Sequence, residues 1–189
     1  MNIVVKTLRH FHTVNKHRFY VFIYACKAGI PFRGLVHDLS KYSITEFWGS
    51  VKYFDGHRSP IYFARKDKGF STVWVHHKGR NKHHFEYWED VSPAGRFVAY
   101  MPYKYIVECI CDKIAATKVY NGKNFNNNQP LDYWNRVDKK GPVMIHPKTA
   151  EFVETVLTKV STDGINKTLK SKYLKKIYKE IDENGNNKV

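Results

Sequence analysis

The chain has 189 residues, three cysteines and a formal net charge of +15. This length suits one domain with a full hydrophobic core, and the few, odd-numbered cysteines argue against a disulfide-stapled secreted scaffold. The charge attracts anions such as nucleotides, nucleic acids and phosphoesters, although a lysine-rich surface alone would give the same value. The sequence shows no signal peptide and no membrane span, so we expect a cytoplasmic protein without a membrane partner.

Helical periodicity dominates the chain from its start. Apolar residues recur at helical spacing from residue 3 to 28, so His17 shares a stripe with Val14 and Val21 and points inward. Further on, capping residues, helix-opening prolines and the same apolar spacing predict more helices. These expected helices are 32–41, one after Ser43, 70–79, one after Asn81, 102–121, a short one near 132–136, one opened by Pro147, and an amphipathic helix ending near 182.

Two segments lack this periodicity. Residues 55–69 are rich in glycine, proline and charge, and residues 123–137 are rich in asparagine, so both are predicted to be largely loops. The chain is therefore expected to form an all-α helical bundle. We predict one domain over residues 1–189, with a core over about 3–122 and a C-terminal helical extension over 123–182.

Histidines and aspartates follow one another in an order that favours a metal site. His17 lies on an apolar stripe, His37 and Asp38 are adjacent, and Asp112 lies on an otherwise uncharged helix face. Two histidine doublets lie between them, and one histidine of each doublet is expected to face the metal. The candidate ligands are His17, His37, Asp38, His77, His83, His84 and Asp112. The histidines expected to be ordinary residues are His10, His12, His57 and His146.

Basic side chains accompany these donors. Lys41 follows Asp38 by three residues, so it either stands beside an anion at the site or forms a simple ion pair with that aspartate. Lys78 and Arg80 lie between the two doublets and are candidates for a second phosphate contact. Glu86 either orients a ligand histidine through its other ring nitrogen or lies on a solvated helix face.

The donor order resembles that of the HD-domain superfamily of metal-dependent phosphohydrolases. The segment HDLSK matches the form H-D-x-x-K, and HDLSKYS, HHKGRNKHHFEYW and ECICD look like an uncharacterised HD-like family of bacteria and their phages. The resemblance covers residues 10–120 and implies a helical bundle with the site between helices. It implies ligands at His17, His37, Asp38 and Asp112, with further histidines from the doublets.

The resemblance also implies an activity. We expect hydrolysis of a phosphoester in a nucleotide or related phosphorylated small molecule, with Asp38 and Lys41 in catalysis. One or two divalent transition-metal ions (Mn, Fe, Co, Ni or Zn) would activate water. Two alternatives are a non-catalytic basic protein that binds nucleic acid on an HD-like scaffold and an HD-like di-iron oxygenase. The oligomeric state does not follow from the sequence.

Overall fold

The computed structural model describes residues 2–186, and their side chains up to residue 183. Helices form nearly all of its regular structure, which confirms the predicted all-α class. The α-helices are α1 (Ile3–Lys27), α2 (Pro31–Val36), α3 (Ile44–Tyr53), α4 (Pro60–Lys68), α5 (Thr72–Lys78), α6 (Tyr103–Asn121), α7 (Gln129–Tyr133), α8 (Pro147–Asp163), α9 (Ile165–Thr168) and α10 (Ser171–Asn186). In the described part of the chain, no helix is both long enough and apolar enough to cross a membrane.

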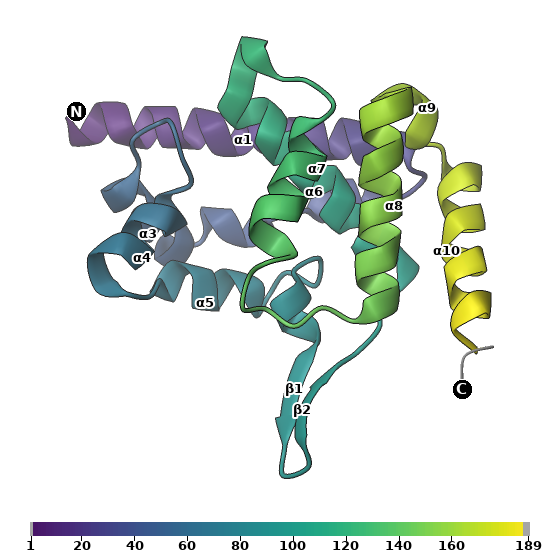
Figure 1. Ribbon diagram of the computed structural model, residues 1–189. Coiled ribbons are helices and arrows are strands. Elements are labelled where there is room, and N and C mark those ends of the chain that lie inside the picture. Colours follow the sequence, from purple (N-terminus) through teal and green to yellow (C-terminus); the bar gives the residue numbers. More distant parts are fainter. Residues whose placement is uncertain (1, 187–189) are drawn as a thin grey trace.

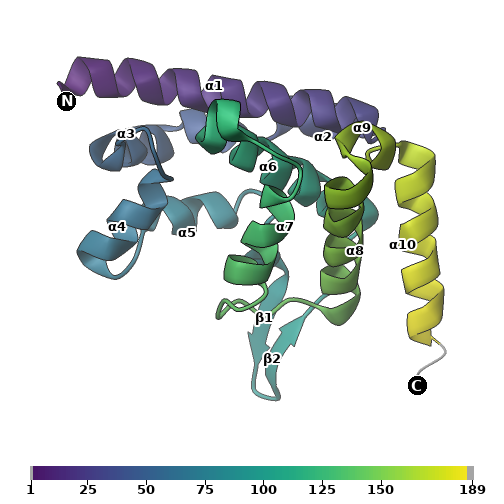
Figure 2. The same cartoon turned by 45° about the horizontal axis from the view of Figure 1, so that its top comes forward.

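The long helix α1 forms one edge of the bundle. It runs the width of the molecule in Figure 1, and Figure 2 shows the other helices gathered along its length. Its inward stripe is buried as predicted and includes Val14, His17 and Val21. This stripe packs mainly against α6 and α2, so the histidine is directed at the centre of the bundle.

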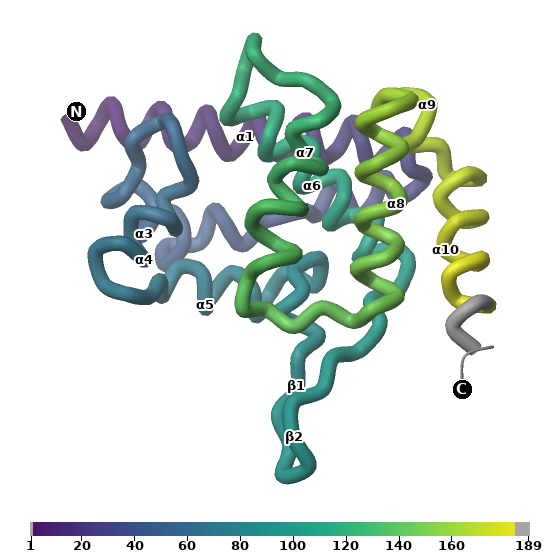
Figure 3. Tube along the Cα trace, viewed as in Figure 1, coloured from purple at the N-terminus to yellow at the C-terminus, as the bar shows by residue number. Residues whose placement is uncertain are grey.

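The hydrophobic core joins both halves of the chain. Val21 of α1 and Ile110 of α6 belong to the same buried cluster as Phe152 of α8 and Leu174 of α10. The tube in Figure 3 shows α8 and α10 side by side next to the C-terminal half of α1. The helices after residue 123 therefore complete the core that α1 and α6 begin.

Of the two segments predicted to be largely loops, the first contains a helix that was not predicted, and the second contains helical turns where the short helix near 132–136 was predicted. In the first, Pro60 opens α4 and Gly69, at a φ of 75°, ends it. These are helix start and stop signals, but the glycine, proline and charge content of the segment hid them. In the second, α7 continues into one turn of π-helix over Trp134–Asp138, whose Trp134 side chain is fully buried.

The predicted helix after Asn81 is wrong. Only a short 3₁₀ turn forms there, over Phe85–Trp88, followed by the antiparallel strands β1 (Glu89–Ser92) and β2 (Gly95–Val98). The hairpin projects away from the helices in Figure 1. Asn81 does not cap a helix, because its side-chain amide donates to the carbonyl oxygen of His77 at 2.9 Å.

Candidate metal centre

The predicted helix over 32–41 is interrupted where two of the donors lie. Helix α2 ends before His37, which has an extended ψ of 128°, and Asp38 adopts the left-handed region at a φ of 52°. Arg18 of α1 donates to the backbone carbonyl oxygens of Leu35 and His37, both at 2.8 Å, and so satisfies groups that the helix end exposes. Because of this break, the two donor side chains turn inward together instead of diverging around a helix.

A glycine allows α2 to lie close against α1 just before the break. Gly34 of α2 lies so close to α1 that a Cβ atom added to it would stand 2.5 Å from the Cβ of Ala25 and 3.0 Å from the Cα of Phe22. Only a residue without a side chain allows this approach. The contact holds the end of α2 against the same helix that carries His17.

The first donor group joins α1, the break and α6. The Nε2 atom of His17 lies 3.0 Å from Oδ1 of Asp112 and 3.3 Å from Nε2 of His37. The latter nitrogen lies 3.2 Å from Oδ2 of Asp38. Ligand atoms about 2.0–2.2 Å from one cation lie roughly 2.9–3.5 Å from one another. Two further pairs are wider, at 3.6 Å from Nε2 of His37 to Oδ1 of Asp112 and 4.0 Å from Nε2 of His17 to Oδ2 of Asp38, so small side-chain shifts would close the group around a single ion.

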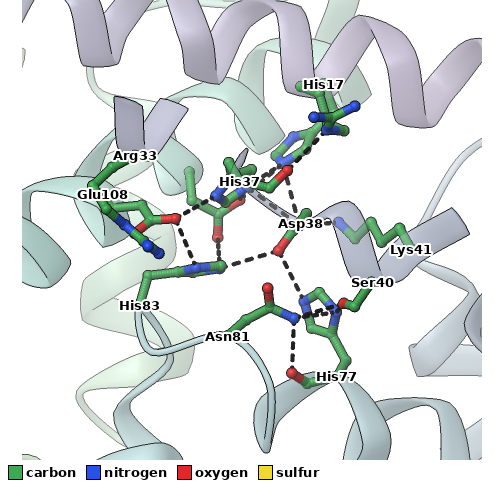
Figure 4. Close-up of polar contacts among 12 residues, drawn as sticks. His17, Arg33, His37, Asp38, Ser40, Lys41, His77, Asn81, His83 and Glu108 are labelled. Carbon is green, nitrogen blue, oxygen red and sulfur yellow. Dashed lines mark hydrogen bonds and ion pairs between the residues drawn. The ribbon is translucent and has the colours of Figure 1, made fainter. Parts of the chain in front are cut away.

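The second donor group uses the other oxygen of the same aspartate. Oδ1 of Asp38 lies 3.4 Å from Nε2 of His77 and 3.5 Å from Nε2 of His83, and His84 offers a further nitrogen within reach. In Figure 4, Asp38 lies between His17 and His37 on one side and His77 and His83 on the other. One carboxylate thus faces two adjacent positions for a cation.

Glu108 supports two of these histidines and was missed by the sequence reasoning. Its Oε1 atom lies 3.0 Å from Nδ1 of His37 and 3.3 Å from Nδ1 of His83, and all three side chains have no exposed surface. Accepting the Nδ1 proton leaves Nε2 with its lone pair directed at the donor group. The available signal was spacing, because Glu108 precedes Asp112 by four residues and lies on the same face of α6.

Glu46 plays the corresponding part for the first doublet. The sequence pattern assigned it to a capping box, and Ser43 does accept from its backbone N–H at 3.3 Å. Its carboxylate, however, lies 2.7 Å from Nδ1 of both His76 and His77. His77 is thereby oriented with Nε2 toward Asp38, while His76 stays outside the donor groups. Among the glutamates of the described residues, Glu46 and Glu108, and not Glu86, have hydrogen bonds to histidine rings.

The three-residue set of His37, His83 and Glu108 is not a third position for a cation. The same carboxylate contacts Arg33, whose Nε and Nη2 atoms both lie 2.7 Å from Oε2 of Glu108. The guanidinium group beside this oxygen, on a side chain that is 24% exposed, would repel a cation.

The pKa shifts at the centre follow from burial and crowding of charge. Burial is the largest influence on the pKa of His84 and, with the neighbouring histidines, holds it well below the usual range, so this ring is neutral. Burial would raise the pKa of Asp112, but hydrogen bonds from His17 and His37 lower it well below its usual value. Burial would lower the pKa of His37, but the carboxylates of Asp38, Asp112 and Glu108 raise it well above its usual value. Because metal ions bind neutral imidazoles and ionised carboxylates, this ring must lose a proton when an ion binds.

Buried polar atoms without partners test whether a cation fits. Within the described residues, Oδ1 of Asp38, Nε2 of His83 and Nε2 of His84 are buried and have no hydrogen-bond partner. All three belong to the second donor group. Unsatisfied buried polar atoms are costly, and a cation bound between them would satisfy all three at once. The donor set therefore fits a divalent metal ion.

The three basic candidates are placed differently. Lys41 forms the ion pair with Asp38, at 2.7 Å from Oδ2, and 30% of its side chain is exposed. Asp112 is 19% exposed whereas Asp38 is 1% exposed, so the centre meets solvent on the side of Asp112 and Lys41. Arg80 is exposed and donates to a backbone carbonyl of α5, and Lys78 is half-buried at the end of that helix.

Comparison with known protein families identifies one family that matches the chain. The model of the family of unknown function DUF5662 matches residues 6–159. The chain belongs to this family. No curated protein and no solved structure matches the chain. The part that the DUF5662 family model covers includes every donor from His17 to Asp112, both supporting glutamates, and most of α8.

Proposed function

We propose that this protein is a metal-dependent phosphohydrolase of the HD type, acting on a nucleotide or a related phosphorylated small molecule. The observation that carries the proposal is the position of Asp38, whose two oxygens face two separate groups of donors. The donors follow one another along the chain in the order by which it resembles the HD-domain superfamily. The formal charge of +15 favours an anionic substrate.

The donor residues divide between two ions. His17, His37 and Asp112 would hold the first, the histidines after α4 would hold the second, and Asp38 would contact both. The histidines of the second position are His77, His83 and His84. When bound, such ions lower the pKa of coordinated water from about 15.7 toward about 7 and neutralise developing phosphoryl charge.

Lys41 is the residue of this chain best placed to bind the phosphoryl group. It lies at the solvent-facing edge of the centre, next to Asp38 and Asp112. Burial would lower the pKa of its ammonium group, but these two carboxylates raise it above its usual value, so the group stays charged. A phosphoryl oxygen that approaches along this side meets a fixed positive charge before it reaches the buried donors.

Hydrolysis assays test the proposal. Purified protein is assayed against nucleoside mono-, di- and triphosphates and p-nitrophenyl phosphate, with added Mn, Co or Ni. We expect metal-dependent turnover that falls at least about 100-fold in Asp38→Asn and His37→Ala. His12→Ala is the matched control, because His12 is an exposed histidine of the helix that carries His17. Turnover that is equal in Asp38→Asn and the wild type would overturn the proposal.

Helix α10 favours one competing function. Its outward face presents a row of exposed lysines, a surface that suits the phosphate backbone of a nucleic acid. These residues are Lys172, Lys175, Lys176 and Lys179, with Lys170 just before the helix. Salt-sensitive binding of an oligonucleotide that is unchanged in Asp38→Asn, without hydrolysis of any substrate, would favour the nucleic-acid-binding function. An iron-dependent absorbance that changes with oxygen would favour the oxygenase.

A further inference from the structure

We infer that Glu108, held in place by Arg33, is a positioning residue shared by both ion sites. The inference rests on the proposed metal centre and names the residue that links its two halves. Glu108 contacts one histidine of each donor group, His37 of the first and His83 of the second, through a single oxygen atom. No other carboxylate of the described residues contacts Nδ1 atoms belonging to both groups.

The protonation of imidazole gives this contact its effect. A neutral imidazole carries one N–H group, and the other ring nitrogen has a lone pair. Nδ1 of His37 donates to Oε1 of Glu108 at 3.0 Å, whereas Nδ1 of His83 lies 3.3 Å from the same oxygen and makes no hydrogen bond in the described residues. This oxygen is the nearest acceptor for both rings, and with the proton on Nδ1 of each ring both Nε2 atoms are free to bind a cation. The three side chains have no exposed surface, so water cannot take the place of the carboxylate. The two rings also lie against each other, with centroids 4.5 Å apart.

Arg33 contacts only one of the two carboxylate oxygens of Glu108. Its Nε and Nη2 atoms both contact Oε2, which leaves Oε1 for the histidines. The guanidinium group also lies over the ring of Tyr105, at 4.9 Å from the centroid, so its own position is fixed. Figure 4 shows the resulting row, in which Glu108 lies between Arg33 and the two histidines.

Glu46 provides a contrast within the same protein. It is also a buried carboxylate that accepts from a ligand histidine, but among the donors it contacts only His77, which belongs to the second group. Its other partner, His76, lies outside both groups. Changing each glutamate to glutamine is therefore expected to reduce metal affinity at different sites.

Glutamine has the shape of glutamate but not its two acceptors. In Glu108→Gln, an amide nitrogen turned toward the histidines would require Nδ1 of each ring to accept, which moves the proton to Nε2 and blocks ligation. The opposite orientation would set the amide N–H groups against Arg33. In either orientation the metal affinity of each of the two ion sites should fall by about 10–100-fold. Glu46→Gln should weaken the second site alone by a similar factor.

The test is a titration of metal-free protein with Co²⁺, in which binding is measured by calorimetry and by the visible absorption of the bound ion. The wild type should bind two ions, Glu108→Gln should show both affinities reduced, and Glu46→Gln only one. Circular dichroism of the metal-free variants controls for folding. Should Glu108→Gln fail to fold, Arg33→Lys keeps the carboxylate, removes the paired contact, and should still weaken both sites.

The outcomes distinguish a failure of the inference about Glu108 from a failure of the proposed phosphohydrolase function. Wild-type affinity at either site in Glu108→Gln refutes the shared role of Glu108, while a wild type that binds two ions and hydrolyses phosphoesters keeps the proposed function. A wild type that binds no Co²⁺ refutes both. Loss of both sites in Glu46→Gln as well would show that any buried carboxylate near the centre has this effect, and the specific link through Glu108 would be wrong.

Discussion

His10 should make the stability of the protein fall as the solution becomes acidic. Its ring is buried on the inward stripe of α1, with its centroid 5.2 Å from those of Phe47 and Phe54. Burial, with a smaller effect of Lys41, lowers its pKa from 6.5 to about 4. Between these values the unfolded chain binds a proton that the folded protein excludes, so stability rises with pH. At pH 5.0 the loss relative to pH 7.5 is about 2 kcal/mol from this residue.

Urea unfolding of the metal-free protein measures this effect. The free energy of unfolding is determined at pH 5.0 and at pH 7.5 for the wild type and for His10→Leu, which keeps an apolar side chain of similar size. Other buried histidines titrate equally in both proteins, so the difference between the two pH dependences isolates His10. The wild type should lose about 2 kcal/mol more than the variant. An identical loss in both proteins would refute the position assigned to His10.

Three further predictions concern packing, a partly buried ion pair and metal binding. Gly34→Ala should lower the free energy of unfolding in urea by about 1–3 kcal/mol, because the new methyl group meets Ala25, and adding Ala25→Gly should restore part of it. A free energy of unfolding in Gly34→Ala equal to that of the wild type would contradict the close approach of the two helices. Asp138→Ala should cost about 2–3 kcal/mol by leaving the ammonium of Lys113 unpaired, and a urea midpoint equal to that of the wild type would count against this pair. A divalent metal at about 100 times its dissociation constant should add about 3 kcal/mol to stability for each bound ion, or about 5 kcal/mol for two. Its removal by a chelator should reverse the shift in melting temperature, and an unchanged temperature would argue against binding.

Much of the fold could be predicted from local patterns. The apolar stripe of α1, the proline that precedes α6 and the proline that opens α8 each specify a helix by sequence alone. The missed helix α4 was a local error, because the composition of the segment hid its start and stop signals, whereas the end of α2 was missed because tertiary contacts decide it. The end of α2 is fixed by Gly34 against α1 and by Arg18 bonding to its carbonyl oxygens. Neither contact leaves a pattern in the neighbouring residues.

In the candidate site, too, some residues could be recognised from the sequence and others only from tertiary contacts. Polar side chains on apolar stripes, such as His17 and Asp112, are unusual enough to be noticed in a sequence, and the structure brings all seven predicted donors together. The supporting glutamates were hidden because each also fits an ordinary local role. Glu46 matched a helix cap, and the four-residue spacing of Glu108 from Asp112 is one that any residue on the same face of α6 would have. Which nitrogen of a histidine faces a carboxylate depends on packing between distant helices, which spacing does not report.

Anomalous diffraction from crystals grown with Co²⁺ tests the metal centre most directly. We expect two peaks on opposite sides of the Asp38 carboxylate, roughly 3.5–4 Å apart. One should lie within bonding distance of Nε2 of His17 and His37, and the other of Nε2 of His77 and His83. Well-diffracting crystals of correctly folded protein with no peak between these side chains, or with cobalt bound only at the surface, would contradict the account.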